Sequence, residues 1–348
     1  MDIKSKKTIL VTGGAGFIGA NFIKYFINTY PNYNIVNIDL LTYAANIENL
    51  SSIAGNPNYT FINGDIADKK LLANIFLDYD IRGVINFAAE SHVDNSITNP
   101  EAFINTNVVG TFALVNTAYK YWMLGPSKPK EGYKDCRFYH ISTDEVYGTL
   151  GETGLFTENT PYAPNSPYSA SKAGSDFLVR AYHHTYGLNV VTSNCSNNYG
   201  PGQHQEKLIP KIIENALNGK EIPIYGDGKN IRDWLYVLDH CKAIDLIYHQ
   251  GKSGQTYNVG GSNEKTNIEV VDTILNILDR KQPRKDGISY KKQVKFVKDR
   301  AGHDRRYAID STYLQNELGW VAAESFSSGI EKTVEHYVLC YTKLSTLV

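Results

Sequence analysis

Short apolar runs alternate with longer segments of helical periodicity along the first half of the chain. The clearest helical patterns lie at residues 17–28, 99–122 and 166–186. The apolar runs are rich in Ile, Val, Phe and Tyr, and they cover residues 8–12, 34–39, 59–63, 83–88, 137–142 and 189–194. Strands that are apolar on both faces and alternate with helices are typical of βαβ units around a buried parallel sheet.

The pattern changes after about residue 195. Helical periodicity recurs at residues 208–217, 267–279 and 326–341, but turn-rich stretches separate these segments. We therefore predict an α/β protein with a Rossmann-type doubly wound parallel sheet in residues 1–195 and a smaller C-terminal α/β substrate-binding lobe in residues 196–348. The chain is expected to return to the first domain near residues 236–250. A length of 348 residues is enough for two such domains.

Charge narrows the class of protein. The formal net charge of -1 argues against a chain built around nonspecific nucleic-acid binding, because that function usually needs a basic excess. Residues 280–306 are a local exception with 11 basic and 3 acidic side chains. This stretch leaves a nucleic-acid role as a minor alternative, and we otherwise interpret it as part solvated surface and part diphosphate-binding segment.

Cysteine usage and hydropathy indicate the compartment. The four cysteines, Cys136, Cys195, Cys241 and Cys340, are far apart and form no CxxC pair, so neither a metal site nor a disulfide framework is predicted. No apolar run reaches the ~18 residues that a membrane span needs. The apolar run near the N-terminus is too short for a signal peptide. The sequence therefore predicts a cytoplasmic protein without a membrane partner.

A glycine-rich turn follows the first predicted strand and opens the first predicted helix. Gly13 permits the tight turn, Gly16 lets the backbone approach a pyrophosphate, and Gly19 permits close packing of the helix on the strand. Asp39 ends the second strand, where a carboxylate binds an adenosine ribose hydroxyl and repels a 2′-phosphate. The pattern favours NAD over NADP, and a glycine turn without a ligand is the alternative for the glycines alone.

Tyr168 and Lys172 lie four residues apart in the predicted helix 166–186 and therefore share one face of it. A tyrosine with an ordinary pKa near ~10 is a poor base, but a neighbouring ammonium and a nicotinamide's positive charge stabilise its phenolate. Such a pair can remove a proton from a sugar hydroxyl while hydride leaves the same carbon. In a chain with 25 tyrosines, an ordinary helix surface is the alternative for the pair alone.

Asp144 and Glu145 follow the predicted strand 137–142 closely. Ligands of doubly wound sheets bind at the carboxyl ends of the strands, so both side chains are expected in the site. For an isolated acidic pair, a solvated turn or a helix N-cap is the alternative. Oxidation alone does not need two further carboxyls, whereas an acid and a base acting on adjacent carbons are what β-elimination of water requires.

Together these motifs resemble the dTDP-glucose 4,6-dehydratase family of the extended short-chain dehydrogenase/reductase superfamily. The most specific part is the triplet Thr143-Asp144-Glu145, where related nucleotide-sugar epimerases usually carry small residues. The resemblance covers essentially the whole chain, with matching segments at residues 13–19, 39–44, 88–94, 142–148, 168–172, 197–201, 206–210, 232–234 and 299–304. It implies an NAD-dependent hydro-lyase that converts dTDP-glucose to dTDP-4-keto-6-deoxyglucose in deoxysugar (dTDP-rhamnose) biosynthesis.

The resemblance also implies a mechanism in three steps. Tyr168, supported by Lys172 and Thr143, deprotonates the hydroxyl on the fourth sugar carbon while hydride passes to tightly bound NAD. Glu145 then removes the acidified proton beside the new ketone, and Asp144 protonates the departing hydroxyl on the sixth carbon. Hydride finally returns to the sixth carbon. Asp144 therefore needs a raised pKa, and Glu145 has to be ionised.

Two sets of binding residues follow from the resemblance and from position at strand ends. For the cofactor, these are Gly13, Gly16, Phe17, Ile18, Gly19, Asp39, Leu40, Thr42, Asp65, Ile66, Ala88, Ala89, Ser91, Thr106, Tyr168, Lys172 and Asn198. For the nucleotide sugar, they are Ser91, His92, Thr143, Asn197, Glu206, Lys207, Leu208, Pro223, Ile224, Tyr225, Arg232, Asn267, Asp299, Arg300 and His303. Arg232 and Arg300 suit a diphosphate because a guanidinium binds phosphate oxygens bidentately, and a surface salt bridge is the alternative for either alone.

Some features depart from the family pattern or leave the assignment open. Residues 202–205 and Ala301 differ from the usual residues, which affects loop rigidity rather than the chemistry.

The long helices 99–122 and 166–186 have apolar faces, and in the family that the chain resembles such helices pair at a dimer interface. The resemblance therefore implies a homodimer. The alternatives are a nucleotide-sugar 4-epimerase, a dehydratase of a different nucleotide sugar, and a silent NAD-binding sensor, which would be expected to have lost Tyr168 or Lys172.

Overall fold

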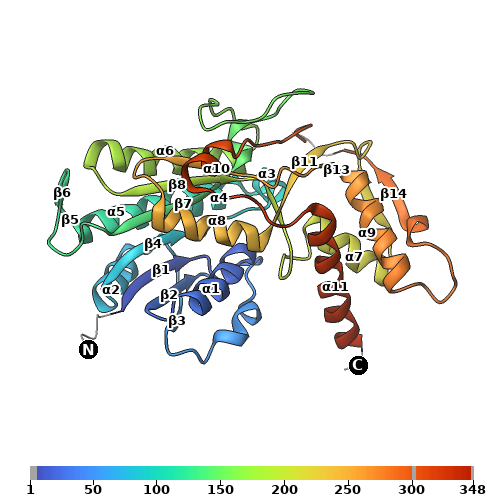
Figure 1. The fold of residues 1–348 in the computed structure, drawn as a ribbon, viewed down its shortest axis with the longest axis horizontal. Helices are drawn as coiled ribbons and strands as arrows, with labels where there is room; N and C mark the ends of the chain where they lie inside the picture. Colours follow the sequence, from blue (N-terminus) through green and yellow to red (C-terminus); the bar gives the residue numbers. More distant parts are fainter. Residues whose placement is uncertain (1–5, 300–302, 346–348) are drawn as a thin grey trace.

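Seven parallel strands form the main sheet (Figure 1). The computed structural model describes residues 6–299 and 303–345. The strand order is β12–β8–β7–β4–β1–β2–β3, and every neighbouring pair is parallel. The strands are β1 (Lys7–Thr12), β2 (Tyr33–Asp39), β3 (Tyr59–Asn63), β4 (Ile81–Asn86), β7 (Arg137–Thr143), β8 (Val190–Cys195) and β12 (Thr256–Val259).

The strand order reverses beside β1. The chain runs outward through β2 and β3 and then returns to place β4 on the other side of β1. Such a reversal leaves a crevice at the carboxyl ends of the central strands, which is where doubly wound folds bind their ligands. The predicted Rossmann-type sheet is confirmed, and the six predicted strands match β1–β4, β7 and β8 to within two residues at each end.

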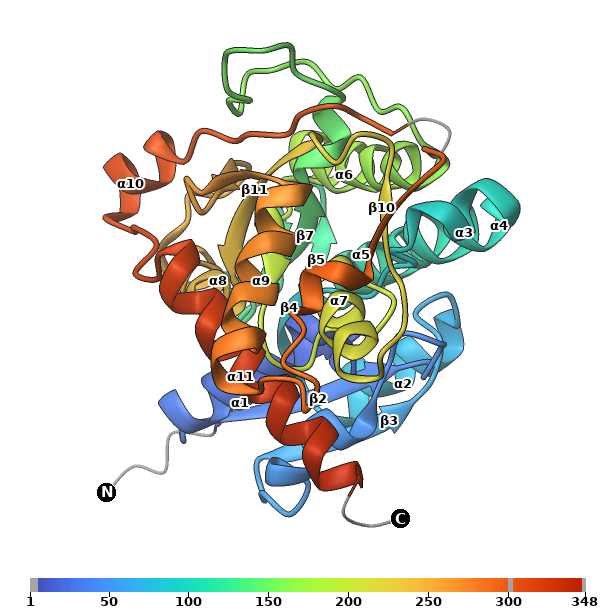
Figure 2. The same cartoon turned by 90° about the vertical axis from the view of Figure 1, so that its right-hand side faces the viewer.

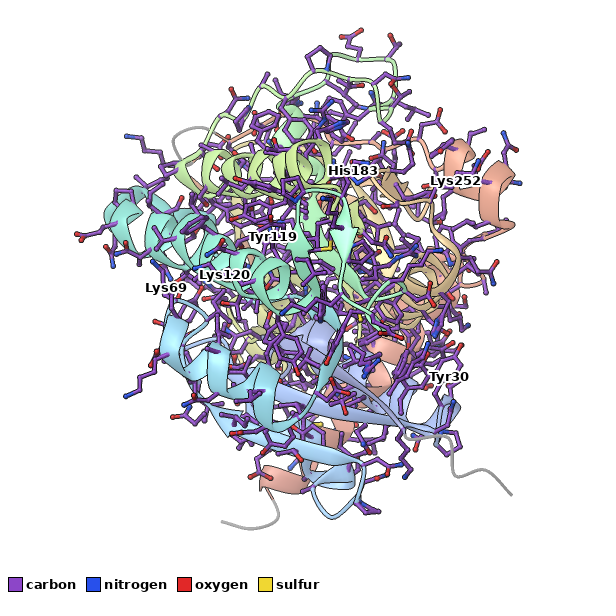
Figure 3. All side chains as sticks on the ribbon, turned by 90° about the vertical axis from the view of Figure 1, so that its left-hand side faces the viewer. Tyr30, Lys69, Tyr119, Lys120, His183 and Lys252 are labelled. Atoms are coloured by element: carbon purple, nitrogen blue, oxygen red, sulfur yellow. The ribbon has the colours of Figure 1, made fainter. Side chains whose placement is uncertain are left out.

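Alternating side chains hold helices against both faces of this sheet. Ile9 and Val11 of β1 pack toward one face and Leu10 toward the other. The first face is covered by α1 (Phe17–Thr29), α8 (Val237–Gln250) and α10 (Thr312–Leu318). The second is covered by α2 (Lys69–Asp78), α5 (Thr111–Trp122) and α6 (Pro167–Tyr186). Figure 3 shows the two layers from one end of the sheet, with Tyr119 on α5 and Tyr30 after α1.

A second hydrophobic core lies to one side of the sheet. The helices that build it stand at the right of Figure 1 and face the viewer in Figure 2. Ile213, Ile274 and Ile330 from three helices pack there against Tyr199 and Trp234. The helices are α7 (Leu208–Leu217), α9 (Asn267–Lys281) and α11 (Phe326–Ser345). The accompanying strands are β9 (Asn197–Tyr199), β10 (Ile222–Tyr225), β11 (Ile231–Tyr236), β13 (Glu264–Thr266) and β14 (Val294–Val297).

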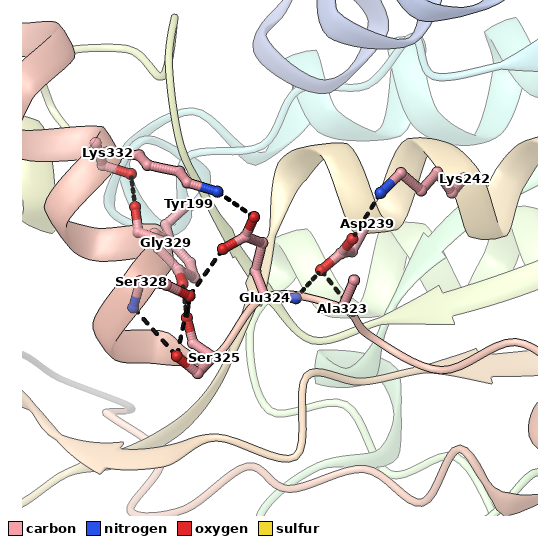
Figure 4. Close-up of polar contacts among 10 residues, drawn as sticks. Tyr199, Asp239, Lys242, Ala323, Glu324, Ser325, Ser328, Gly329 and Lys332 are labelled. Carbon is pink, nitrogen blue, oxygen red and sulfur yellow. Dashed lines mark hydrogen bonds and ion pairs between the residues drawn. The ribbon is translucent and has the colours of Figure 1, made fainter.

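The chain passes between these two cores several times. Helix α8 packs on α1, and β12 then joins the main sheet beside β8. The chain therefore contributes to the sheet layer beyond the expected return at residues 236–250. Near the start of α8, Asp239 Oδ2 accepts hydrogen bonds from Ala323 N at 3.0 Å and Glu324 N at 2.7 Å (Figure 4). This contact ties the segment that leads into α11 to the sheet layer.

The predicted helix 99–122 is interrupted in the structure. After α3 (Val93–Thr98), the helix begins with α4 (Pro100–Phe103), widens into the π-helical segment η2 (Ile104–Gly110) and continues as α5. The buried Asn107 amide fixes the wide turn, because its Oδ1 accepts from Glu90 N at 2.8 Å and its Nδ2 donates to Ser171 Oγ at 2.8 Å. These contacts link η2 to the end of β4 and to α6.

Short elements complete the described chain. They are the hairpin strands β5 (Met123–Gly125) and β6 (Lys128–Pro129), and the 3₁₀ turns η1 (Ile47–Ile53), η3 (Asp144–Tyr147) and η4 (Tyr290–Gln293). Within residues 6–299 and 303–345, no helix is both long enough and apolar enough to cross a bilayer.

Candidate active site

A cleft opens at the carboxyl ends of the central strands. It is bounded by the glycine turn after β1, by the ends of β2, β3, β4 and β7, and by residues 195–207. All five predicted catalytic residues line it, and so do all the predicted cofactor residues. The sequence therefore identified the walls of one cavity from segments that are far apart in the chain.

The glycine turn is shaped by close backbone contacts. Gly13 has φ +67°, and a Cβ there would lie 2.6 Å from Ala88 N. A Cβ on Gly19 would lie 2.5 Å from Gly13 O, so this position holds α1 tightly against the turn. Helix α1 begins at Phe17 without a side-chain cap. Its first N–H groups are thus left to an anionic ligand at the positive end of the helix dipole.

Asp39 closes the far end of this part of the cleft. Its Oδ2 accepts from Ala15 N at 2.9 Å and its Oδ1 from Leu41 N at 2.8 Å. Burial raises the pKa of the carboxyl despite these two bonds. An ionised carboxylate offers about four lone-pair positions, so Asp39 retains capacity to accept from a ribose hydroxyl. The uncapped helix end and this buried acid together fit a dinucleotide such as NAD.

The acidic pair stands where β7 ends. Thr143 Oγ1 accepts a hydrogen bond from Glu145 N at 3.3 Å and lies 3.3 Å from Asp144 Oδ1, so the threonine caps the short η3 turn that carries both acids. Asp144 is almost completely buried. Its Oδ2 makes no hydrogen bond within the described protein. A buried carboxyl oxygen without a partner is expected to find one on a ligand.

Burial is also the main influence on the protonation of Asp144. It raises the pKa of Asp144 well above the usual range, the nearby Glu145 and Asp233 carboxyls raise it further, and Arg232 partly opposes this. A carboxyl held in its neutral form can donate a proton at neutral pH. A raised pKa is the shift that a general acid requires.

Tyr168 and Lys172 face the acidic pair from the first turns of α6. The tyrosine hydroxyl shares a hydrogen bond with the Thr143 side chain, and the Tyr168 ring packs edge-on against Phe103 at 6.2 Å. Lys172 Nζ donates to Ile141 O at 2.7 Å. Burial and the Glu145 carboxylate raise the pKa of Tyr168. Because the protein alone favours the phenol, ionisation of Tyr168 depends on positive charge brought close to it.

Residues from the second half of the chain cover the cleft. Asn197, Asn198 and Lys207 line it, and Lys207 Nζ donates to Ser91 O at 3.2 Å across the opening. Glu206 Oε2 lies 3.9 Å from His92 Nε2, so these two predicted residues also meet across the same opening. Leu208 follows directly as the first residue of α7.

The other predicted nucleotide-sugar residues that the structure describes belong to elements around the second core and do not line the cleft. Arg232 on β11 is buried, donates to Asp304 O at 2.9 Å and stacks on the Tyr307 ring at 4.3 Å. Its positive charge lowers the pKa of Asp144, in opposition to burial. Pro223, Ile224 and Tyr225 form β10, Asn267 begins α9, and His303 contacts Asp299 at 2.7 Å. Arg300 and Ala301 lie outside the described residues.

Several lining residues were not predicted. Ser142 and Cys195 stand at the ends of β7 and β8, so the strand-end rule that identified Asp65 could have found them. Glu90 lies between two predicted residues. Gln203 and His204 belong to the stretch that departs from the family pattern, and Gln203 Nε2 donates to Asn198 O at 2.9 Å. The departure therefore alters the cover of the cleft.

Comparison with known proteins agrees with this geometry. A family model described as GDP-mannose 4,6 dehydratase matches residues 10–333. The chain belongs to this dehydratase family. Within the dehydratases, the chain is 56% identical over 331 residues to the dTDP-glucose 4,6-dehydratase of Xanthomonas campestris pv. campestris, covering 95% of this chain and 93% of that protein. The resemblance to dTDP-glucose 4,6-dehydratases is thereby confirmed.

Solved dehydratase structures have the same fold. The dTDP-glucose 4,6-dehydratase of Bacillus anthracis, solved in complex with NAD, is 46% identical with a TM-score of 0.84, over 96% of this chain and 97% of that one. The enzyme of Streptomyces venezuelae, solved with NAD and TYD bound, is 42% identical with a TM-score of 0.87, over 97% and 98% of the two chains. Both matches extend across the sheet and the second core.

Proposed function

We propose that this protein is an NAD-dependent dTDP-glucose 4,6-dehydratase that forms dTDP-4-keto-6-deoxyglucose. One observation carries the proposal: Asp144 and Glu145 line the same cleft as Tyr168 and Lys172. A hydroxyl oxidation needs only the second pair, whereas the removal of water also needs an acid and a base on neighbouring carbons. The high identity to dehydratases of this name supports the choice of substrate.

Each residue is assigned a step that its position allows. Tyr168 takes the proton of the hydroxyl on the fourth sugar carbon, held in place by its hydrogen bond to Thr143. The glycine turn and Asp39 would hold NAD, which would supply a reversible hydride acceptor and positive charge beside the phenol. Glu145 removes the proton beside the ketone. Asp144 is buried and protonated, and it donates its proton to the hydroxyl that departs from the sixth carbon.

The nucleotide end of the substrate is assigned to the second core. Arg232 is oriented by Asp304 O and by the Tyr307 ring, which leaves its guanidinium rigid before any ligand arrives. A rigid guanidinium loses less conformational freedom when it binds a diphosphate. The ends of β10 and α9, with Asp299 and His303, lie around the same part of the lobe and are proposed to contact the base and ribose.

A nucleotide-sugar 4-epimerase is the main alternative activity. It would use Tyr168 and Lys172 in the same way, but it has no step for a buried, protonated Asp144 beside Glu145. A dehydratase of a different nucleotide sugar would keep Tyr168, Lys172 and the acidic pair, and it would differ only in the residues around the second core.

Product analysis tests these alternatives directly. The purified protein is incubated separately with dTDP-glucose, UDP-glucose and GDP-mannose, and the products are examined by mass spectrometry and by the alkali-induced absorbance of keto sugars. The proposal predicts loss of one water from dTDP-glucose and much slower turnover of the other two. Formation of an isomer of unchanged mass would instead indicate an epimerase, and the Tyr168→Phe variant controls for a contaminating enzyme.

We further propose that the protein acts in the cytoplasm as a homodimer that feeds deoxysugar (dTDP-rhamnose) biosynthesis. Ile104 and Val109 on η2 and Phe177 on α6 expose large apolar side chains on two elements that contact each other. Sedimentation velocity should give a dimer for the natural protein and a monomer for Phe177→Glu. The matched control is Leu124→Glu on the β5 hairpin, which also replaces an exposed apolar residue and should remain dimeric.

A further inference from the structure

A buried polar network lies directly beneath the catalytic lysine, in residues that no proposed step uses. Its centre is Asp176, which stands one helical turn after Lys172 on α6 and is only 4% exposed. Ser142 Oγ donates to Asp176 Oδ2 at 2.7 Å. His140 Nε2 lies 3.2 Å from Asp176 Oδ1. Both partners come from β7, the strand that ends at Thr143 and leads into the acidic pair.

The protonation of His140 follows from its contacts. Asn86 Nδ2 is a donor and lies 3.1 Å from His140 Nδ1, so Nδ1 accepts and the ring proton resides on Nε2, which faces Asp176. Burial and the nearby Lys172 lower the pKa of His140 to about 4, although Asp176 partly opposes this. The imidazole is therefore neutral at physiological pH. Its Nε2 lies 3.1 Å from Ser175 Oγ as well as near Asp176, so it lies against the Asp176 carboxylate without neutralising it.

Apart from Lys172, the remaining titratable neighbours of Asp176 are also uncharged. In the described part of the chain, the titratable side chains that face it are His140 on β7, Tyr147 on η3, Tyr162 in the loop before α6, and Lys172 on its own helix. Burial raises the pKa of both tyrosines and proximity to Asp176 adds to this, so they are protonated. Lys172 is the cation in this set.

We propose that Asp176 is a positioning residue whose fixed negative charge keeps Lys172 in its ammonium form and so allows Tyr168 to ionise during catalysis. The inference rests on the proposed function for its kinetic consequence. Burial lowers the pKa of Lys172, and Asp176 is the leading group that opposes this, followed by Cys195. Ser142 anchors the carboxylate one helical turn from Lys172, and Asp176 itself does not line the cleft.

The test replaces Asp176 by Asn, which keeps the shape and one acceptor oxygen but removes the charge. In the NAD-loaded protein with ¹³Cε-labelled lysine, the Lys172 signal is assigned with Lys172→Arg and followed through a pH titration. Asp176→Asn should lower the pKa of Lys172 by about one unit or more. A general loosening of the helix would admit water and raise that pKa, so the sign of the change separates the two effects.

Kinetics give the second measurement. With Lys172 less often charged, Tyr168 ionises at higher pH, so the acid limb of the kcat/KM profile for dTDP-glucose should move upward by a similar amount. Asp245→Asn is the matched control. It also removes a buried, hydrogen-bonded carboxylate, held by the Tyr25 and Tyr30 hydroxyls on the opposite face of the sheet, and it should change neither titration.

Each outcome bears on one claim. An unchanged or raised pKa of Lys172 in Asp176→Asn overturns the inference whatever the activity. A lowered pKa in a protein that does not turn over dTDP-glucose overturns the proposed function and leaves the Asp176–Lys172 coupling standing. If Asp176→Asn does not fold, Ser142→Ala is used instead, because it removes one donor to the same carboxylate. It should shift the pKa of Lys172 and the acid limb of the kcat/KM profile in the same directions, but by less. If neither quantity shifts in Ser142→Ala, the inference is overturned.

Discussion

The two pairs to which we assign catalytic steps line one cleft, yet burial has opposite consequences for them. Low solvent exposure favours neutral forms, so it holds the proton on Asp144 that the elimination step has to deliver. The same burial raises the pKa of Tyr168, which has to lose its proton in the oxidation step. A buried acid therefore needs little help from its surroundings, whereas a buried tyrosine base needs positive charge nearby. We assign that positive charge to Lys172, which follows Tyr168 by one turn on α6.

The largest expected effect comes from Tyr168→Phe, which removes the base of the oxidation pair. Without oxidation the neighbouring C–H is not acidic, so the elimination pair cannot act either. Overall turnover should fall by about 10³ to 10⁴, near the upper end of what one general base contributes. Stopped-flow absorbance at 340 nm should detect no reduced cofactor, and a normal burst of reduced cofactor would contradict the role of Tyr168.

Glu145→Gln breaks the elimination pair alone. The variant should still oxidise the sugar, so reduced cofactor accumulates, while release of water falls by about 10² to 10³. Solvent deuterium should no longer enter the fifth carbon of the sugar. Equal loss of oxidation and elimination would show that the two pairs do not divide the chemistry.

Asp144→Asn tests the acid and its pH dependence. The natural protein needs Asp144 protonated, so its elimination rate should decline as pH rises through the raised pKa of this carboxyl. The variant should be slower by about 10² and should lack this alkaline decline. The measurement is a pH profile of kcat for both proteins, and a parallel decline in the variant would assign the limb to another group.

The smallest effect is on stability. Because the Asp144 pKa is higher in the folded than in the unfolded chain, folding favours its protonated form, and stability falls as pH rises from the unfolded pKa through the folded pKa. Asp144→Asn lacks this dependence. Its Tm should therefore gain a few degrees on the natural protein between pH 5 and pH 8, as followed by circular dichroism. A constant difference in Tm across this range would show that the Asp144 proton is not linked to folding.

The sheet half of the site was predictable because its residues obey a positional rule. Gly13, Asp39 and Asp144 each follow a strand, and parallel strands bring their carboxyl ends to one edge. The supporting network was not predicted for a physical reason: His140 lies inside a strand and Asp176 inside a helix, where a polar residue has no local sequence signal that distinguishes a buried partner from an exposed one.

No comparable positional rule predicts the binding residues around the second core. Arg232, Asn267 and His303 were taken from the family resemblance, and they lie on three different elements whose packing depends on contacts remote in sequence. Helix α2 was not predicted, although Asp68 caps it by accepting from Lys70 N at 2.9 Å. The interruption of helix 99–122 was also missed, because π-helical turns have no distinct periodicity.

The wide turn of η2 makes the protein sensitive to the deletion of a single residue. A π-helical segment contains an added residue relative to a regular α-helix, so deleting one residue between positions 104 and 110 would restore regular winding. The part of the helix before the deletion would then rotate by about 100° relative to α5. Thr106 would leave the cleft wall and Asn107 would lose Glu90 and Ser171. A single-codon deletion here should therefore yield a folded but cofactor-poor protein.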